Sequence, residues 1–280
     1  MRKFILSLFL FFLITILYFL IYISYFGIKT SKFDNLIQSK ANEINQNIKL
    51  EFQNTKIYLS YKSLNLNVKL QNPKLLVKNN EIKLSKLDLF LSLKSFFTQD
   101  FLLKKAEVAF YKNDIKDLTK ITSVFLPKII NKQLNKAFEK GNIEGEFIIP
   151  FKSDGTIDKD YGFSGKISKA NINITKKFSI KNLTSEVFYF KNNENGNYKI
   201  LVEEGNIYNL SLSKSEINLN VNETKTIFDG RILTKGKLNL SEIRVISSLL
   251  GFKKLNFNNI NGDIDLINKI KFHINKQLKI

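Results

Sequence analysis

The sequence predicts a mainly β protein with a few helices, in which an N-terminal transmembrane helix precedes an antiparallel β-sheet with helical insertions. Three observations predict this fold class. The first 23 residues after Lys3 carry no charge. Most of the remaining chain alternates apolar and polar residues with a period of two, which is typical of strands with one dry and one wet face. In two places this alternation gives way to helical spacing.

The uncharged segment from Phe4 to Phe26 is the predicted membrane anchor. A helix of this length extends about 35 Å, enough to cross a bilayer core of about 30 Å. Tyrosines near its end suit the headgroup boundary, and no small-x-small cleavage site follows it. We therefore expect an uncleaved, single-pass signal anchor within residues 1–28, with residues 29–280 outside the cytoplasm. The anchor residues are Phe4, Phe12, Leu20, Tyr22 and Tyr25.

Residues 29–115 predict a juxtamembrane helix followed by a first sheet segment. Apolar residues three and four apart favour an amphipathic helix over 31–47, behind a serine that can cap it. Strand alternation begins at Ile57 and continues to Phe110. The alternating positions include Ile57, Leu59, Tyr61, Leu64, Leu66, Val68, Leu70, Leu87, Leu89, Leu91, Leu93, Ala106, Val108 and Phe110.

A helical insertion is predicted over residues 116–141, split or kinked by Pro127 and ended by Gly141. The remaining residues, 142–280, form a second sheet segment that contains a short helix at 241–250. The alternation slips by one residue after Tyr61, Ile167 and Leu212, which indicates a turn or bulge at each place. Asn195-Gly196 and Asp154-Gly155 are typical of hairpin turns, so consecutive strands are expected to pair as an antiparallel meander.

Composition excludes several classes of function. The net charge is +19, but only three of the 44 basic residues are arginine, and the lysines are spread along the chain rather than clustered. We predict no nucleic-acid partner, because no recognition motif accompanies the charge. With no cysteine and one histidine, His273, the chain lacks the residues of common metal sites and nucleophilic triads. We expect no catalytic residue, no metal and no cofactor, and we assign Asp263 and Asp265 to the surface.

Several segments resemble the AsmA-like superfamily of bacterial envelope proteins, which includes the YhdP and TamB types. The resemblance rests on the anchor, the helix at 31–47, the Leu87–Phe97 and Leu103–Phe110 blocks, and glycine-containing repeats at Gly236–Ser241 and Ile260–Leu266. It covers most of the chain and consists of patterns of apolar residues and glycines. The YhdP and TamB types are far longer, so the chain is either a short member or a piece of a longer protein.

The resemblance implies a bridge-like lipid carrier, in which a curled, groove-like sheet has an apolar inside. It places the anchor in the bacterial inner membrane and residues 29–280 in the periplasm. Membrane phospholipids would be the partners, and the function would be lipid transport between inner and outer membranes or outer-membrane biogenesis. The residues that would line the groove are Leu66, Val68, Leu89, Leu91, Val108, Phe110, Leu210, Leu212, Leu219 and Ile264.

A second reading gives the apolar strand faces a different role. They form a closed core in any β sandwich, and the protein is then a non-catalytic structural or assembly factor of the envelope. Its partner would be another envelope protein, added at the C-terminal edge strand. A third reading, an envelope hydrolase, requires a pocket with convergent polar groups that the sequence does not show.

Overall fold

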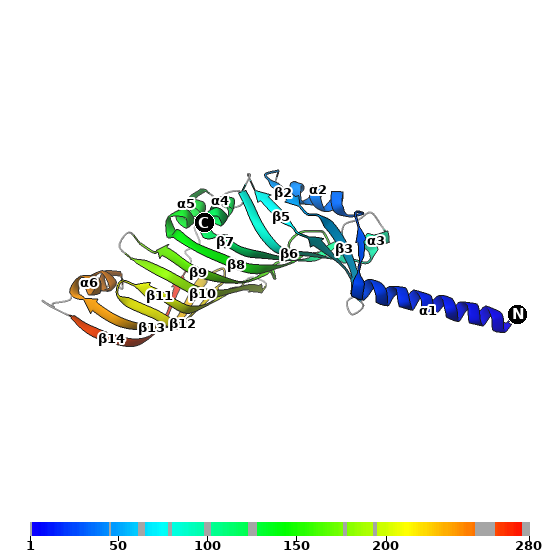
Figure 1. Cartoon of the computed structure of the whole chain (residues 1–280). Helices are drawn as coiled ribbons and strands as arrows, with labels where there is room; N and C mark the ends of the chain where they lie inside the picture. The colour runs from blue at the N-terminus through cyan, green and yellow to red at the C-terminus, as the bar shows by residue number, and fades with distance from the viewer. Residues whose placement is uncertain are drawn as a thin grey trace. The chain divides into compact units, whose positions relative to one another are not determined.

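A computed structural model describes residues 2–44, 46–60, 65–77, 80–97, 102–122, 128–175, 178–192, 195–249 and 261–275. The chain is mostly β, and an N-terminal apolar helix leads into an antiparallel sheet that is not closed, which confirms the predicted fold class (Figure 1). Fourteen strands in the described residues form this sheet. The chain divides into two compact units, described separately below: unit 1 comprises residues 1–109 and 148–158, and unit 2 comprises 110–147 and 159–280.

The N-terminal helix α1 (Arg2–Phe26) is long and apolar enough to span a membrane over Phe4–Phe26, as predicted. Gly27 ends it in the left-handed region, at φ +66°, and its N–H donates to the carbonyl of Ile23. Strand β1 (Ile28–Thr30) follows at once and pairs with β3 (Asn54–Ser60). All five predicted anchor residues lie in α1 with exposed side chains.

The hydrogen-bonded order of the sheet is β1-β3-β4-β6-β7-β8-β9-β10-β11-β12-β13-β14, and β5 pairs with both β6 and β2. The predicted meander is therefore confirmed from β6 onward, where each strand follows its neighbour in sequence. The bounds of the strands not yet given are β2 (Ile48–Glu51), β4 (Asn65–Gln71), β5 (Lys74–Val77), β6 (Asn80–Ser92), β7 (Leu103–Asp114), β8 (Phe138–Pro150), β9 (Gly162–Asn173), β10 (Ser179–Asn192), β11 (Asn195–Ile207), β12 (Leu210–Val221), β13 (Lys225–Asn239) and β14 (Asn261–Asn275).

Unit 1 contains a dry core built from alternating strand residues. Val68 of β4 lies between Ile57 of β3 and Leu89 of β6, and Leu66 lies between Leu59 and Leu91 in the next row. Val68 and Leu91 expose none of their surface. Burying a side chain of this size is worth about 1.5–3 kcal/mol, so these rows contribute strongly to the stability of the unit.

Helix α2 (Asp34–Ile44) covers part of this core, together with the short strands β2 and β5 (Figure 1). Phe33, which precedes α2, and Ile37 within it are both 3% exposed. The hydroxyl of Thr55 in β3 donates to the carboxylate of Asp34, which joins the start of the helix to the sheet. The helix is shorter than the predicted 31–47, because the chain forms a hydrogen-bonded turn from Ser31 to Asp34 before it. A further short helix, α3 (Lys94–Phe97), follows β6.

Glu107 of β7 links two lysines in unit 1. Its carboxylate accepts hydrogen bonds from Lys86 at 2.5 Å and from Lys105 at 2.7 Å, and its side chain is 16% exposed. Burial raises the pKa of Glu107, but the hydrogen bonds and charges of Lys105 and Lys86 lower it by more, so the pKa lies below its ordinary value of 4.5. The carboxylate therefore stabilises the fold when it is ionised.

Because the folded pKa is depressed, this contribution is fully present above pH 4.5 and is lost as pH falls through the folded value. We expect Glu107→Gln to lower the free energy of unfolding by about 1 kcal/mol at pH 7, the upper range for an ion pair that solvent reaches. The difference from the parent should shrink below pH 4.5 in urea titrations. Glu43→Gln, which removes the exposed Lys40–Glu43 pair, is the control and should change little at either pH. If Glu107→Gln lowers the free energy of unfolding equally at all pH values, the ionised carboxylate of Glu107 is not the source of the stability.

The two phase slips in unit 2 that the structure describes are bulges within continuous strands. In β9 the slip after Ile167 coincides with Lys169 at φ +51°, and the pairing of β9 with β10 shifts register there. In β12 the slip after Leu212 coincides with Lys214 at φ +49° and a register shift against β13. Each bulge returns the apolar residues beyond it to the same face of the sheet. The slip after Tyr61 lies outside the described residues.

The predicted insertion forms two helices, α4 (Ile115–Thr122) and α5 (Lys128–Ala137), and Pro127 lies outside the described residues. The hydroxyl of Thr119 in α4 donates to the side chain of Asn135 in α5 at 2.7 Å, which joins the pair. Strand β8 begins at Phe138, so the insertion ends earlier than the predicted residue 141. Ile115 packs into a core cluster with Ala170, Leu183, Val202 and Leu212.

The short helix predicted at 241–250 is α6 (Leu240–Leu249). It begins with a reciprocal cap: the side chain of Asn239 accepts from the Glu242 N–H, and the carboxylate of Glu242 accepts from the Asn239 N–H, both at 3.0 Å. Glu242 also accepts from the side chain of Asn209 at 3.0 Å, which ties the helix to the turn before β12.

Of the two turn predictions, one is confirmed and one is wrong. Asp154-Gly155 lies in a turn closed by the Phe151–Ile157 bridge, with Gly155 at φ +83°. Asn195-Gly196 forms the first two residues of strand β11 instead, where Asn195 pairs with Asn192 and Gly196 pairs with Lys191. The ring of Tyr189 lies close to Gly196 and would be 3.3 Å from an added Cβ.

Candidate functional site

The candidate site is one face of the unit 2 sheet, where apolar side chains from β9 to β14 face the same way. Cross-strand pairing aligns them in rows that run across the strands. One row passes through Gly165, Val187, Ile200, Ile217, Gly230 and Ile270, and another ends at Leu210, Gly236 and Ile264. An apolar face this continuous offers a dry surface without directional polar partners.

A third row consists almost entirely of aromatic residues, and we call it the aromatic row. From β9 to β14 it is formed by directly paired residues, and the rings of Phe110 in β7 and Phe147 in β8 extend it. It thus follows eight consecutive strands, which spans about 34 Å at the usual strand spacing. Its members are Phe110, Phe147, Phe163, Tyr189, Tyr198, Leu219, Phe228 and Phe272.

Ring contacts join the aromatic row along most of its length. The centroids of Phe147 and Phe163 are 4.7 Å apart, those of Tyr189 and Tyr198 are 4.5 Å apart, and those of Phe228 and Phe272 are 4.8 Å apart. Phe110 stacks on Phe163 at 6.3 Å. Such pairs contribute about 0.5–1.5 kcal/mol each beyond the burial of their area, so the row is preorganised rather than a chance alignment of side chains.

Glycines beside the aromatic row give its rings room to lie against the sheet. A Cβ on Gly165 would come within 2.5 Å of the Phe163 ring, and one on Gly145 would come within 2.7 Å of the same ring. A Cβ on Gly230 would meet the Phe228 ring at 2.7 Å. Covering a strand glycine with a neighbouring aromatic ring is a recurring way of stabilising a sheet.

The two tyrosines of the aromatic row are uncharged at neutral pH. Burial is the main cause that raises the pKa of Tyr189, and a hydrogen bond between its hydroxyl and that of Tyr161, at 3.3 Å, raises it further. Burial likewise raises the pKa of Tyr198. Both phenols therefore stay protonated far above physiological pH, and the row carries no ionised group.

The opposite face of the same strands carries their charged residues, together with the exposed Phe190 and Ile267. Lys166 bonds to Glu203 at 2.6 Å, Lys199 to Glu216 at 3.1 Å, and Lys271 lies 3.5 Å from Asp229. These pairs are exposed and contribute little to stability. Their position matters more, because it shows that the sheet of unit 2 has one apolar and one wet face, as the alternation predicts.

The apolar face is covered unevenly. Near α4 it is a packed core, where Ala170 is fully buried and Leu183, Val202 and Leu212 are 5–7% exposed. The aromatic row is more open from Phe147 onward: Phe147 is 39% exposed, Phe272 is 44% exposed, and Phe163, Tyr189, Tyr198, Leu219 and Phe228 are half-buried, whereas Phe110 at its other end is 9% exposed. The open part of the face is therefore the aromatic row from Phe147 to Phe272.

The structure places the predicted lining residues in different surroundings. Five of them lie on the apolar face of unit 2: Phe110 and Leu219 in the aromatic row, and Leu210, Leu212 and Ile264 several residues farther along their strands. Leu66, Val68, Leu89 and Leu91 lie in the core of unit 1, each 8% exposed or less, and Val108 is half-buried in β7. The lining role stays a prediction for all ten. It requires the cover to open over the four core residues of unit 1, and also over Phe110, Leu210 and Leu212, which are 5–9% exposed.

Most members of the aromatic row were not identified by sequence reasoning. Phe163, Tyr189, Tyr198 and Phe228 each alternate with polar residues, which is the signal that could have included them. The pattern identifies the face of each residue within its own strand. Only the cross-strand register shows that these residues meet in a single row.

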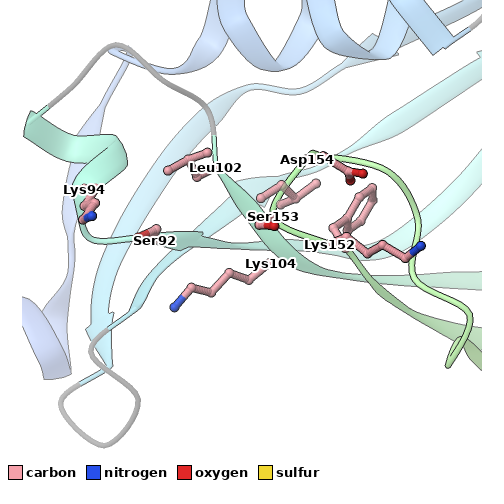
Figure 2. Close-up of a pocket in the computed structure, with 10 residues that line it drawn as sticks. Ser92, Lys94, Leu102, Lys104, Lys152, Ser153 and Asp154 are labelled. Atoms are coloured by element: carbon pink, nitrogen blue, oxygen red, sulfur yellow. The ribbon is translucent and has the colours of Figure 1, made fainter.

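Unit 1 contains a separate cavity of about 460 Å³, lined by residues that include Ser92, Lys94, Leu102, Lys104 and Lys152 (Figure 2). Lys104 and Lys152 extend to opposite sides of it in this view. The ammonium group of Lys104 donates to the side chain of Asn65 at 2.7 Å. The ammonium groups of these two lysines therefore do not converge on one point of the cavity.

The groups assigned to the surface from the sequence lie on β14. Asp263 and Asp265 are exposed. Their carboxylates lie 4.0 and 3.6 Å from the ammonium groups of Lys237 and Lys235 in the neighbouring strand β13. His273 is exposed and pairs with Ile227. Within the described part of the chain, no three His, Cys, Asp or Glu side chains gather closely enough to hold a metal ion.

Comparison with known proteins does not identify the chain. No family model, no curated protein and no solved structure matches it.

Proposed function

We propose that the apolar face of unit 2 binds phospholipid acyl chains, and that the aromatic row is the centre of the binding surface. The observation that carries this proposal is a preorganised row of uncharged rings that is only half covered. Each methylene moved from water onto such a face gains up to about 0.8 kcal/mol, and acyl chains need no hydrogen-bonding partner. The row spans about 34 Å, similar to the bilayer core of about 30 Å that two opposed acyl chains fill.

The proposal places the protein in the bacterial inner membrane, held by α1, with residues 29–280 in the periplasm. There it contributes to lipid transport between the inner and outer membranes, or to outer-membrane biogenesis, and performs no catalytic step. The resemblance to AsmA-like proteins supports this setting. The apolar α1 is consistent with an anchor, and the polar opposite face of unit 2 suits contact with water.

Charged substitutions in the aromatic row test the proposal. The full chain, purified in detergent or nanodiscs, is incubated with a phospholipid that carries a photoreactive acyl chain, and crosslinked lipid is measured. We expect Leu219→Asp with Phe272→Asp to reduce crosslinking by about tenfold or more, because the ligand would cover two carboxylates. The matched control is Asn218→Asp with His273→Asp, which adds the same residues to the same two strands on the opposite face. Equal crosslinking in the two variants, with both folded by circular dichroism, would overturn the proposal.

An assembly role is the second candidate, and a separate observation favours it. Strand β14 is 15 residues long and exposes Leu266, Ile267, Phe272 and Ile274 by 44–58%. A strand of this kind at the edge of a sheet is a template for the addition of another strand. If the assembly role is correct and the lipid role is not, purified protein will carry no lipid, and changes in β14 will reduce assembly.

A further inference from the structure

Strand β14 pairs on one side only in the part of the chain that the structure describes. On that side it is matched to β13 without a bulge, from Asn261 opposite Asn239 to Asn275 opposite Lys225. Figure 1 shows it as the last strand of the order, beside β13. Its other edge presents backbone N–H and C=O groups that a further strand can pair with.

The side chains of β14 follow a pattern that reverses about its midpoint. On the polar face, Asp263 and Asp265 occupy the first half, Lys269, Lys271 and His273 occupy the second, and Ile267 lies between them, next to the midpoint. On the apolar face, Ile264 and Leu266 precede Asn268, and Ile270 and Phe272 follow it. The strand is therefore complementary to a copy of itself that runs in the opposite direction.

We propose that two copies of this chain associate through antiparallel pairing of their β14 strands, with the two-fold axis at Asn268. In this register Asp265 faces Lys271 of the second copy, and Asp263 faces its His273. On the apolar face, Ile264 lies opposite Phe272 of the second copy, and Leu266 lies opposite its Ile270. By symmetry each of these pairs occurs twice, which is the property of an isologous interface.

The contacts of β14 with β13 show that this charge order suits an antiparallel neighbour. Lys235 lies 3.6 Å from Asp265, and Asp229 lies 3.5 Å from Lys271. Strand β13 thus places a base opposite Asp265 and an acid opposite Lys271, although Arg231 lies opposite Lys269. A second β14 running antiparallel provides the same order at the free edge.

Other pairings between copies satisfy fewer of these groups. A parallel pairing in register would place Asp265 opposite Asp265 and Lys271 opposite Lys271, and like charges directly opposite one another are destabilising. A head-to-tail pairing with β1, at the other end of the sheet order, would engage only the three residues Ile28–Thr30. Pairing of β14 with β14 also aligns the apolar faces of the two sheets. It does not depend on the lipid-binding proposal.

Cysteine crosslinking tests the register directly, since the chain contains no cysteine. In the full chain, kept in its native membranes and treated with a mild oxidant, Asn268→Cys should form a disulfide-linked dimer, because the two introduced thiols lie opposite each other. The control Asn275→Cys changes the same residue type on the same strand, near its end. Its two copies would be about 48 Å apart in this register, so it should not crosslink. Absence of the Asn268→Cys dimer, or equal crosslinking of the two variants, would overturn the proposal.

Charge exchange tests whether the pairing is between chains. With Asn268→Cys as the reporter, Asp265→Lys alone should reduce crosslinking by about tenfold, because Lys then faces Lys271 twice across the axis. Adding Lys271→Asp should restore crosslinking, since the opposite charges face each other again. Within one chain the double change worsens both contacts with β13, where Lys235 and Asp229 remain. Recovery therefore cannot arise from a better monomer, and failure to recover would overturn the proposal.

Discussion

Replacing Leu91 by alanine is expected to lower the free energy of unfolding by about 2–5 kcal/mol. Leu91 exposes none of its surface and pairs with Leu66 in the core of unit 1. The substitution removes buried methyl groups and leaves a cavity that a tightly paired sheet cannot close. Urea titration of the full chain in detergent, followed by circular dichroism, measures the effect.

Leu219→Ala is the matched comparison for Leu91→Ala. It removes the same atoms from another predicted lining residue that is only half-buried, so a smaller loss, of about 1 kcal/mol, is expected. If the two variants lose equal stability, the distinction between a closed core in unit 1 and an open face in unit 2 is wrong. If Leu91→Ala loses more, as expected, a loss of lipid binding in a Leu91 variant reports the loss of the unit 1 core, not the loss of a lipid contact.

Gly236→Ala is the second substitution with a large expected effect, a loss of about 2–4 kcal/mol. Gly236 has φ +148°, a conformation that residues with a side chain rarely adopt. An added Cβ would also collide with the backbone carbonyl oxygen of Asn209 and lie 3.2 Å from the Cα of Leu210. Backbone atoms of a paired strand cannot move aside as a side chain can.

The control for Gly236→Ala is Gly262→Ala in the neighbouring strand β14. A Cβ at Gly262 would meet no atom within 4 Å, and Gly262 pairs with Leu238, two residues beyond Gly236. We expect a change within about 0.5 kcal/mol for this variant. Both glycines belong to the repeats on which the resemblance to AsmA-like proteins rests, but only Gly236 is required by local geometry. Equal losses in the free energy of unfolding of Gly236→Ala and Gly262→Ala, measured by urea titration, would contradict the geometric requirement for Gly236.

Sequence patterns predicted the type of the elements better than their partners. The anchor, the strand faces, the helices near 116–141 and 241–250, and the bulges in β9 and β12 each produce a local signal in the sequence. Asn195-Gly196 predicts a turn, but the two residues pair with Asn192 and Lys191 of β10, and an added Cβ on Gly196 would lie 3.3 Å from the ring of Tyr189 in that strand. No pattern within a single strand reports such a contact.

For the same reason, sequence patterns could predict only part of the candidate site. Alternation placed Phe110 and Leu219 on the dry faces of their own strands, but it could not show that they share a row with Tyr189, Phe228 and Phe272. The row depends on the register of eight strands, which is set by many non-local pairings and two bulges. A shift of one residue in any strand would turn its member of the row to the opposite face.

By itself, the sequence determined that this protein has an apolar N-terminal helix, one-faced antiparallel strands and few residues suited to common enzyme chemistry. These properties are local, because they depend on residue type and on spacing along the chain. The tertiary structure alone decided which apolar positions are closed and which are open. Val68 and Leu91 are covered in unit 1, whereas Leu219 and Phe272 lie half-buried or exposed in unit 2. Alternation shows that a face is dry, but the elements that pack against it determine whether it becomes a core or a binding surface.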